Sequence, residues 1–136
     1  MTTPAVLPHI DAITAALEGV DLTVYLGGAP PGVAPTNTQP YVVLYPDPGV
    51  SVRASLADNR VDFTAVIQLT CVGLTAQQAL NVCDRAQSVL SAPLLVGDRT
   101  AWRPEPLEGQ PVRRDDDVVP PCFYAISRFR LRSTPL

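Results

Sequence analysis

Hydrophobic and polar positions alternate most regularly in the middle of the chain, in the segment RVDFTAVIQLTCVG at residues 60–73. Side chains of a β-strand point alternately to its two faces, so a period of two predicts a strand with one buried face. The odd positions are Val61, Phe63, Ala65, Ile67, Leu69 and Cys71. We therefore predict a long strand whose odd face lies on the core and whose even face carries mixed residues.

A second alternating segment, CFYAISRFRLR, occupies residues 122–132. One face of this strand would carry Phe123, Ala125, Ser127, Phe129 and Leu131. The other face would carry Cys122, Tyr124, Ile126, Arg128, Arg130 and Arg132. Two shorter segments, DLTVYLG at residues 21–27 and YVVLYP at residues 41–46, are also predicted strands. Because the second is apolar on both faces, we expect it to be central or covered on both sides.

Apolar residues recur at helical spacing in two other places. Residues 7–18 predict a helix whose apolar face consists of Ile10, Ile13 and Leu17. The second helix begins after Thr75, and Gln78 three residues later completes the pattern of a capping box. Pro93 ends it, because proline cannot continue a helix.

Proline and glycine separate these elements. Residues 27–40 and 104–121 are rich in both and are predicted to be long loops. Residues 94–106 predict a hairpin that turns at Gly97–Asp98. The order of helix, strands, helix and strands predicts an α+β fold, with a mostly antiparallel sheet and two helices on one face. We expect one domain spanning residues 1–136.

Two helices on one face leave the other face of the sheet to be explained. That face would carry Val66, Val72, Cys122, Tyr124 and Ile126 beside polar residues and the arginines of the last strand. Monomers rarely expose a large apolar patch, and protein interfaces are enriched in tyrosine and arginine. We therefore predict that this face contacts another protein chain. The alternative is a monomer in which a loop folds back over the face.

Composition narrows the classes of function. The chain has 136 residues, a net charge of −3 and ten basic residues, all of them arginine. Phosphate attraction dominates nucleic-acid binding, so an acidic chain is a poor nucleic-acid binder by default. The single histidine excludes a multi-histidine metal site, and the three cysteines form no C-x-x-C pair and are expected to be small buried residues. We find no cofactor motif or membrane-spanning segment, and expect a soluble, intracellular protein without a cofactor.

The densest charge lies in the segment RRDDD, which consists of Arg113, Arg114, Asp115, Asp116 and Asp117. A Mg²⁺ or Ca²⁺ site needs several converging oxygens, whereas consecutive residues of an extended chain point in alternating directions. A small metal-dependent hydrolase built on these aspartates is therefore the weaker hypothesis. Two others stay open, namely a solvated loop in which the arginines balance the aspartates, and ion pairs to the arginine face of a neighbouring chain.

Three segments carry a family resemblance: PYVVLYPDPG, FTAVIQLTCVGLTAQQALNVCDRAQSVL and RRDDDVVPPCFYAISRFRL. From about Pro40 to the C-terminus the chain resembles tail terminator proteins of long-tailed phages that infect actinobacteria. The run R-D-D-D-x-x-P-P-x-F-Y-A is the most specific part. The resemblance implies a small α+β fold without catalytic residues. It also implies a ring, typically of six subunits, that caps the tail tube, stops its growth and meets the head-completion or neck proteins of the virion.

A closed ring needs two different patches on each subunit. Our candidates are the 113–117 segment and the last strand, with the interface residues Arg113, Arg114, Asp115, Asp116, Asp117, Tyr124, Ile126, Arg128, Arg130 and Arg132. DNA passes such a ring without specific binding, and an acidic wall repels phosphate. For that wall we predict Asp47, Asp58 and Asp62. A head–tail connector of similar size and a generic dimeric accessory domain remain as alternatives.

Overall fold

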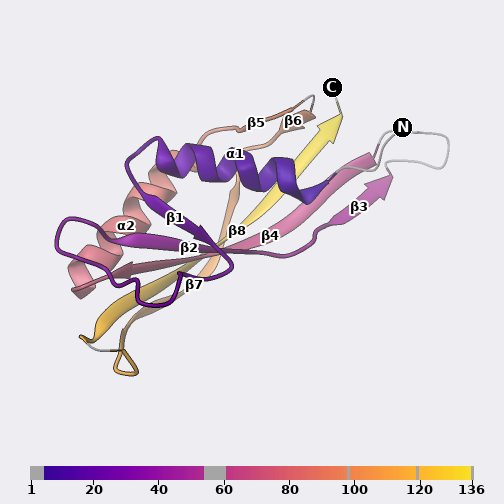
Figure 1. Cartoon of the computed structure of the whole chain (residues 1–136). Coiled ribbons are helices and arrows are strands. Elements are labelled where there is room, and N and C mark those ends of the chain that lie inside the picture. The colour runs from indigo at the N-terminus through magenta and orange to yellow at the C-terminus, as the bar shows by residue number, and fades with distance from the viewer. Residues whose placement is uncertain (1–4, 54–60, 98, 119, 136) are drawn as a thin grey trace.

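The computed structural model describes residues 5–53, 61–97, 99–118 and 120–135 (Figure 1). Its elements in chain order are α1 (Val6–Glu18), β1 (Thr23–Leu26), β2 (Tyr41–Pro46), β3 (Val50–Arg53), β4 (Val61–Gly73), α2 (Ala76–Val89), β5 (Leu95–Val96), β6 (Arg99–Ala101), β7 (Glu105–Asp115) and β8 (Cys122–Pro135). The predicted α+β fold is confirmed, because these residues form a mostly antiparallel eight-stranded sheet with two helices.

Strands β4 and β8 form the centre of the sheet and run together along the length of the molecule (Figure 1). They pair antiparallel, from Phe63 opposite Ser133 to Gly73 opposite Phe123. β2 and β3 follow one another along the outer edge of β4, and β7 and β6 do so along the outer edge of β8. β1 lies at the far edge as the parallel partner of β2.

The odd residues of β4 lie under the helices, as predicted. Residues 63, 65, 67, 69 and 71 are buried, whereas the even residues from 62 to 70 are half-buried. Both helices contribute to one core cluster with the strands, and its members include Ile10, Ile13, Leu17, Ile67, Leu69, Val82, Ala86, Phe129 and Leu131. We call this side of the sheet the helix face and the opposite side the open face.

The predicted start of α2 is confirmed. The hydroxyl of Thr75 accepts a hydrogen bond from the backbone N–H of Gln78 at 3.0 Å. The amide oxygen of Gln78 accepts from the backbone N–H of Leu74 at 2.7 Å, so the side chain bonds one residue ahead of the cap. Its amide nitrogen donates to the carbonyl oxygens of Thr36 and Asn37 at 2.9 and 3.0 Å. Gln78 therefore also ties the 27–40 loop to the body of the protein.

His9 anchors α1 to the ends of β4 and β8. Its ring stacks on Phe63 with centroids 4.3 Å apart. Nδ1 donates to the carbonyl of Ala5 at 2.8 Å, which leaves Nε2 to accept from the hydroxyl of Ser133 at 2.6 Å. The Ser133 oxygen accepts in turn from Nε of Arg99 at 2.9 Å. Burial lowers the pKa of His9 below 6.5, against the bond to Ala5 and with the help of the Arg99 charge, so the ring is neutral at pH 7.

The expected loop at residues 104–121 is wrong over most of its length, because residues 105–115 form strand β7. Among the described strands, β7 pairs with β8 alone and lies at an edge, where a proline that lacks an N–H is tolerated. Its register shifts between Leu107 and Gln110 and again between Gln110 and Arg113. A Cβ on Gly109 would lie 2.4 Å from the carbonyl oxygen of Ile126, so only glycine fits the first shift.

The remaining expectations fare unevenly. The hairpin at residues 94–106 is confirmed but short, since only β5 and β6 pair, and Gly97 has a φ of +54° at the turn. Residues 27–40 contain no helix or strand, as predicted.

Strand β3 was not anticipated. The turn before it depends on Gly49, which has a φ of +79° and whose added Cβ would lie 2.3 Å from the ring of Phe63.

The expectation of buried cysteines is largely confirmed. Cys71 and Cys122 are buried, Cys83 is half-buried against the core, and all three are free thiols. A hydrogen bond with Cys83 and burial raise the pKa of the Cys71 thiol, which therefore stays protonated as a core side chain.

Candidate functional site: the open face of the sheet

The open face carries an arginine row that register places in one line. Arg128, Arg130 and Arg132 of β8 lie opposite Gln68, Val66 and Thr64 of β4. On the other side of β8, Leu107 and Glu105 of β7 lie opposite Arg128 and Arg130. Cα partners in a sheet project to the same face, so these residues form one surface across three strands.

Two members of the arginine row have partners on the same surface. Arg130 forms an ion pair with Glu105 at 3.4 Å. The guanidinium of Arg132 lies 5.9 Å from the ring centroid of Trp102, which is within reach of a cation–π interaction. The Trp102 backbone N–H also donates to the Arg132 carbonyl at 2.9 Å, which holds the main chain of Trp102 beside the row. Trp102 remains 53% exposed, and exposed Trp beside Arg is a typical composition of interface hot spots.

A shallow depression of about 320 Å³ lies between the arginine row and the edge of the sheet. It is lined by Tyr45, Pro46, Asp47, Val66, Gln68 and Arg128. Tyr45 is exposed and Val66 is half-buried, so the depression offers apolar walls beside a cation. A hydrophobic side chain from another protein would fit this chemistry better than an anionic ligand, which needs several convergent donors.

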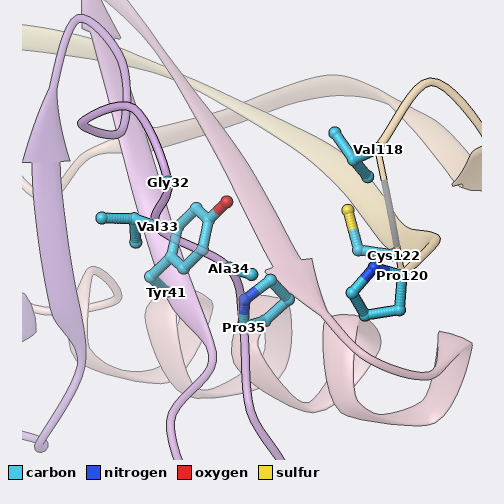
Figure 2. Close-up of a pocket in the computed structure, with 8 residues that line it drawn as sticks. All are labelled: Gly32, Val33, Ala34, Pro35, Tyr41, Val118, Pro120 and Cys122. Atoms are coloured by element: carbon cyan, nitrogen blue, oxygen red, sulfur yellow. The ribbon is translucent and has the colours of Figure 1, made fainter.

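The other end of the open face is apolar and partly covered by the chain itself. Tyr41, Val43, Val72 and Cys122 form a second buried cluster against which Tyr25, Ala29 and Tyr124 pack. Figure 2 shows residues 32–35 of the 27–40 loop on one side of a cavity and Val118, Pro120 and Cys122 on the other. The cavity has a volume of about 250 Å³. Within the described residues, the 27–40 loop therefore folds back over this end of the open face, as the monomer alternative expected for the whole face.

The cavity provides no reactive group. Burial raises the pKa of Cys122, and the charge of Asp115, its partner across β7 and β8, raises it further. Burial likewise raises the pKa of Tyr41. Both side chains therefore stay protonated at neutral pH, which makes the cavity an apolar recess and not a nucleophile site.

The 113–117 segment forms the end of β7 and a tight turn. Arg114 pairs with Asp116 at 2.6 Å, and Oδ1 of Asp115 accepts from the Asp117 backbone N–H at 3.0 Å. Arg113 lies opposite Tyr124 on the open face, whereas Arg114 lies opposite Phe123 and projects to the helix face. Within the described ranges, no three His, Cys, Asp or Glu side chains converge as metal ligands would. The internal pairing follows the predicted balance of arginines and aspartates, at least for Arg114.

The acidic residues predicted for a ring lumen occupy different settings. The Asp47 carboxylate accepts hydrogen bonds from the backbone N–H groups of Gly49 at 2.9 Å and Val66 at 3.2 Å. It thereby holds the turn between β2 and β3 on β4. Asp62 is half-buried near the start of β4, on the open face. Asp58 lies outside the described residues.

Sequence reasoning missed the contribution of Trp102, Glu105, Leu107 and Gln110 to the open face. Each belongs to β7 or follows β6, and both strands reach the face only by pairing with β8. The sequence signal for this contribution was Trp102 itself, an aromatic residue two positions before Pro104. Its position beside Arg132 depends on a pairing between segments that are 30 residues apart, which no local pattern reveals.

Comparisons with known proteins agree on the fold. One chain of a solved "virion of native gene transfer agent (GTA) particle" matches with a TM-score of 0.58 at 19% sequence identity, over 96% of this chain and 92% of that chain. A second solved structure matches with a TM-score of 0.57 at 12% identity, over 95% of this chain and 94% of that chain. No protein-family model matches, and no curated protein does. In the described part, no helix is long and apolar enough to cross a membrane.

Proposed function

We propose that this chain is a structural subunit of a virion and, more specifically, a tail terminator of a long-tailed phage. Copies of it form a closed ring, typically of six, that caps the tail tube and ends its polymerisation. The ring presents its other side to the head-completion or neck proteins. In this role the chain acts by shape and surface chemistry and needs no cofactor.

The observation that carries the proposal is the open face between Val66 and Arg132. Among the described residues, helices bury one side of β4 and β8, whereas on the other side the 27–40 loop covers the Tyr41 end. The rest of the described open face combines an exposed tryptophan, an arginine row and a shallow depression with both apolar and charged walls. A protein that assembles with other chains needs such a surface, whereas an enzyme needs converging polar groups in a cleft.

The structural comparison supports the same class. The similar chain belongs to a gene transfer agent virion, and the likeness covers nearly the whole of both chains. A fold can serve several functions, so the likeness adds to the open face and does not replace it. The segments that resemble tail terminators also map onto β2, β4, α2 and β8, which build the core and the open face.

Passage of DNA through the ring is the part of the proposal that concerns Asp62. A half-buried carboxylate at the start of β4 would repel phosphate if that end of the sheet faced the lumen. Asp47 is a poorer probe of this idea, because its carboxylate holds the turn to β3. Asp62→Arg should slow DNA delivery while leaving particle assembly intact, and infectivity of the complete virion measures it.

The experiment combines the purified chain with the tail tube protein encoded in the same genome. Light scattering and negative-stain images should show rings on tube ends, and tubes should stop lengthening. Ile126→Asp, a change at the centre of the open face, should abolish capping. Leu80→Asp is the matched control, because Leu80 is 46% exposed on α2, away from the open face. Monomers that leave tube growth unchanged would contradict the proposal. Binding to a neck protein but not to the tube would instead indicate a head–tail connector.

A further inference from the structure

The outer surface of α1 is acidic. Ile10, Ile13 and Leu17 point into the core, so the opposite side of the helix carries the exposed residues Leu7, Asp11, Ala15 and Glu18. The helix contains no Arg or Lys, and the exposed Asp21 follows it in the next turn. We call Leu7, Asp11, Ala15 and Glu18 the acidic stripe.

The acidic stripe has charges without partners in the described part of the chain. Neither Asp11 nor Glu18 takes part in an ion pair or side-chain hydrogen bond there. The same holds for Arg128 on the open face, and the recorded side-chain contact of Arg132 is the Trp102 ring. The centre of the row, Arg130, is already paired with Glu105. Among the described residues, the arginines of the row that form no ion pair with an acid are therefore those at its two ends.

The spacings of the two surfaces are similar. Asp11 and Glu18 are separated by seven residues of α-helix, which at its rise per residue is about 10 Å along the axis. Arg128 and Arg132 are separated by four residues of strand, which is about 13 Å. Long arginine side chains span the difference easily. Each surface also offers an exposed apolar group, with Leu7 62% exposed on the stripe and Trp102 53% exposed beside the row.

The two surfaces lie on opposite sides of the molecule. α1 packs on the helix face and contributes to its core, whereas the arginine row belongs to the open face. Two copies that met open face to open face would bring like charges together, which is repulsive. A contact between the row of one copy and the stripe of the next joins opposite charges and uses a different patch on each copy. Such a heterologous contact is the kind that closes into a ring.

We propose that the acidic stripe of α1 in one copy packs against the arginine row of β8 in the next copy. This inference rests on the proposed ring and names the surfaces that build it. It replaces the 113–117 segment as the acidic partner, because Arg114 and Asp116 already pair within the chain and Asp115 bonds to its own turn. Arg–carboxylate pairs are directional, so the contact would fix the register between neighbours.

Charge reversal tests the contact. The stripe variant carries Asp11→Arg and Glu18→Arg, and the row variant carries Arg128→Glu and Arg132→Glu. All four residues are exposed, so each variant should unfold within a few degrees of the wild type. Each alone should raise the protein concentration needed for half-maximal ring assembly on tubes at least tenfold. Asp84→Arg, an exposed reversal on α2, is the matched control and should leave assembly unchanged.

Restoration is the decisive part. A 1:1 mixture of the stripe variant and the row variant should assemble again, because each reversed surface then meets an opposite charge on the other variant. A single chain with all four changes should also assemble. If the stripe variant assembles like the wild type while the row variant fails, the row binds the tube protein and the inference is overturned, but the proposed function stands. If the wild type forms no ring with tubes, that result contradicts the proposed function itself, and with it the inference.

Discussion

The two faces of β4 and β8 are built from alternate residues of the same two strands, yet they differ in almost every physical property. The helix face is closed, apolar and shared by both helices. At the α1 end of this face, the polar side chains of Arg99, Ser133 and His9 are joined by hydrogen bonds. The open face mixes half-buried Val66 and Ile126 with exposed arginines and a tryptophan. The helix face holds the larger buried core, whereas the open face combines a smaller buried cluster at its Tyr41 end with the exposed charged and aromatic side chains of the arginine row.

The largest expected effect on stability distinguishes the two faces through substitutions at neighbouring residues of β4. Ile67→Ala leaves a cavity in the helix-face core and should lower the free energy of unfolding by about 2–5 kcal/mol. Val66→Ala, one residue earlier on the open face, should cost about 1 kcal/mol or less. Urea unfolding of the unassembled protein measures both. Equal losses would show that the open face is as much a part of the core as the helix face.

A second change should damage the open face while sparing the helix face. Gly109→Ala places a methyl group against the Ile126 carbonyl and should cost about 1–3 kcal/mol by displacing β7. Gln110→Ala, at the next residue, has no such clash and is the control. Hydrogen exchange should speed up in residues 105–115 and remain slow in α2. Unchanged exchange in β7 would mean that this close approach does not hold the strand.

A third test concerns the helix face and uses the pH dependence of the free energy of unfolding. The folded-state pKa of His9 lies below its ordinary value of 6.5, so the unfolded chain binds the proton more tightly. The contribution of neutral His9 to the free energy of unfolding is complete above about pH 6.5 and is lost as the pH falls toward the folded-state pKa. The loss of unfolding free energy between pH 7 and pH 5 should therefore be larger in the wild type than in His9→Gln. Identical losses would remove His9 as the acid-sensitive anchor of α1.

The smallest effect on stability is expected from the arginine row. Arg130→Ala breaks an exposed ion pair with Glu105, and such pairs contribute about 0–1 kcal/mol. Glu105→Ala should give the same small loss, and 0.5 M salt should reduce the difference from wild type. A loss near that of Ile67→Ala would mean that the row supports the fold and is not reserved for a partner.

The sequence predicted what local patterns can encode. Period-two alternation identified β4 and β8 and assigned their faces correctly, and Thr75 with Gln78 marked the start of α2. Strand β7 was lost because Pro106, Gly109 and Pro111 normally indicate a loop, whereas pairing with β8 at an edge tolerates them. The face on which Tyr124, Ile126 and the arginines of β8 lie was predicted, but the positions of Trp102 and Glu105 beside them were not. Their positions depend on strand pairing across the chain, which alternation does not contain.

Trp102 allows the central claim to be tested directly, because it is the single tryptophan of the chain and stands exposed beside the arginine row. The measurement is acrylamide quenching of its fluorescence, for the free chain and for the chain assembled on tail tubes. If copies assemble through the open face, the quenching constant should fall severalfold on assembly and the emission should shift to shorter wavelength. Assembly with unchanged quenching would place the contacts elsewhere and contradict the account.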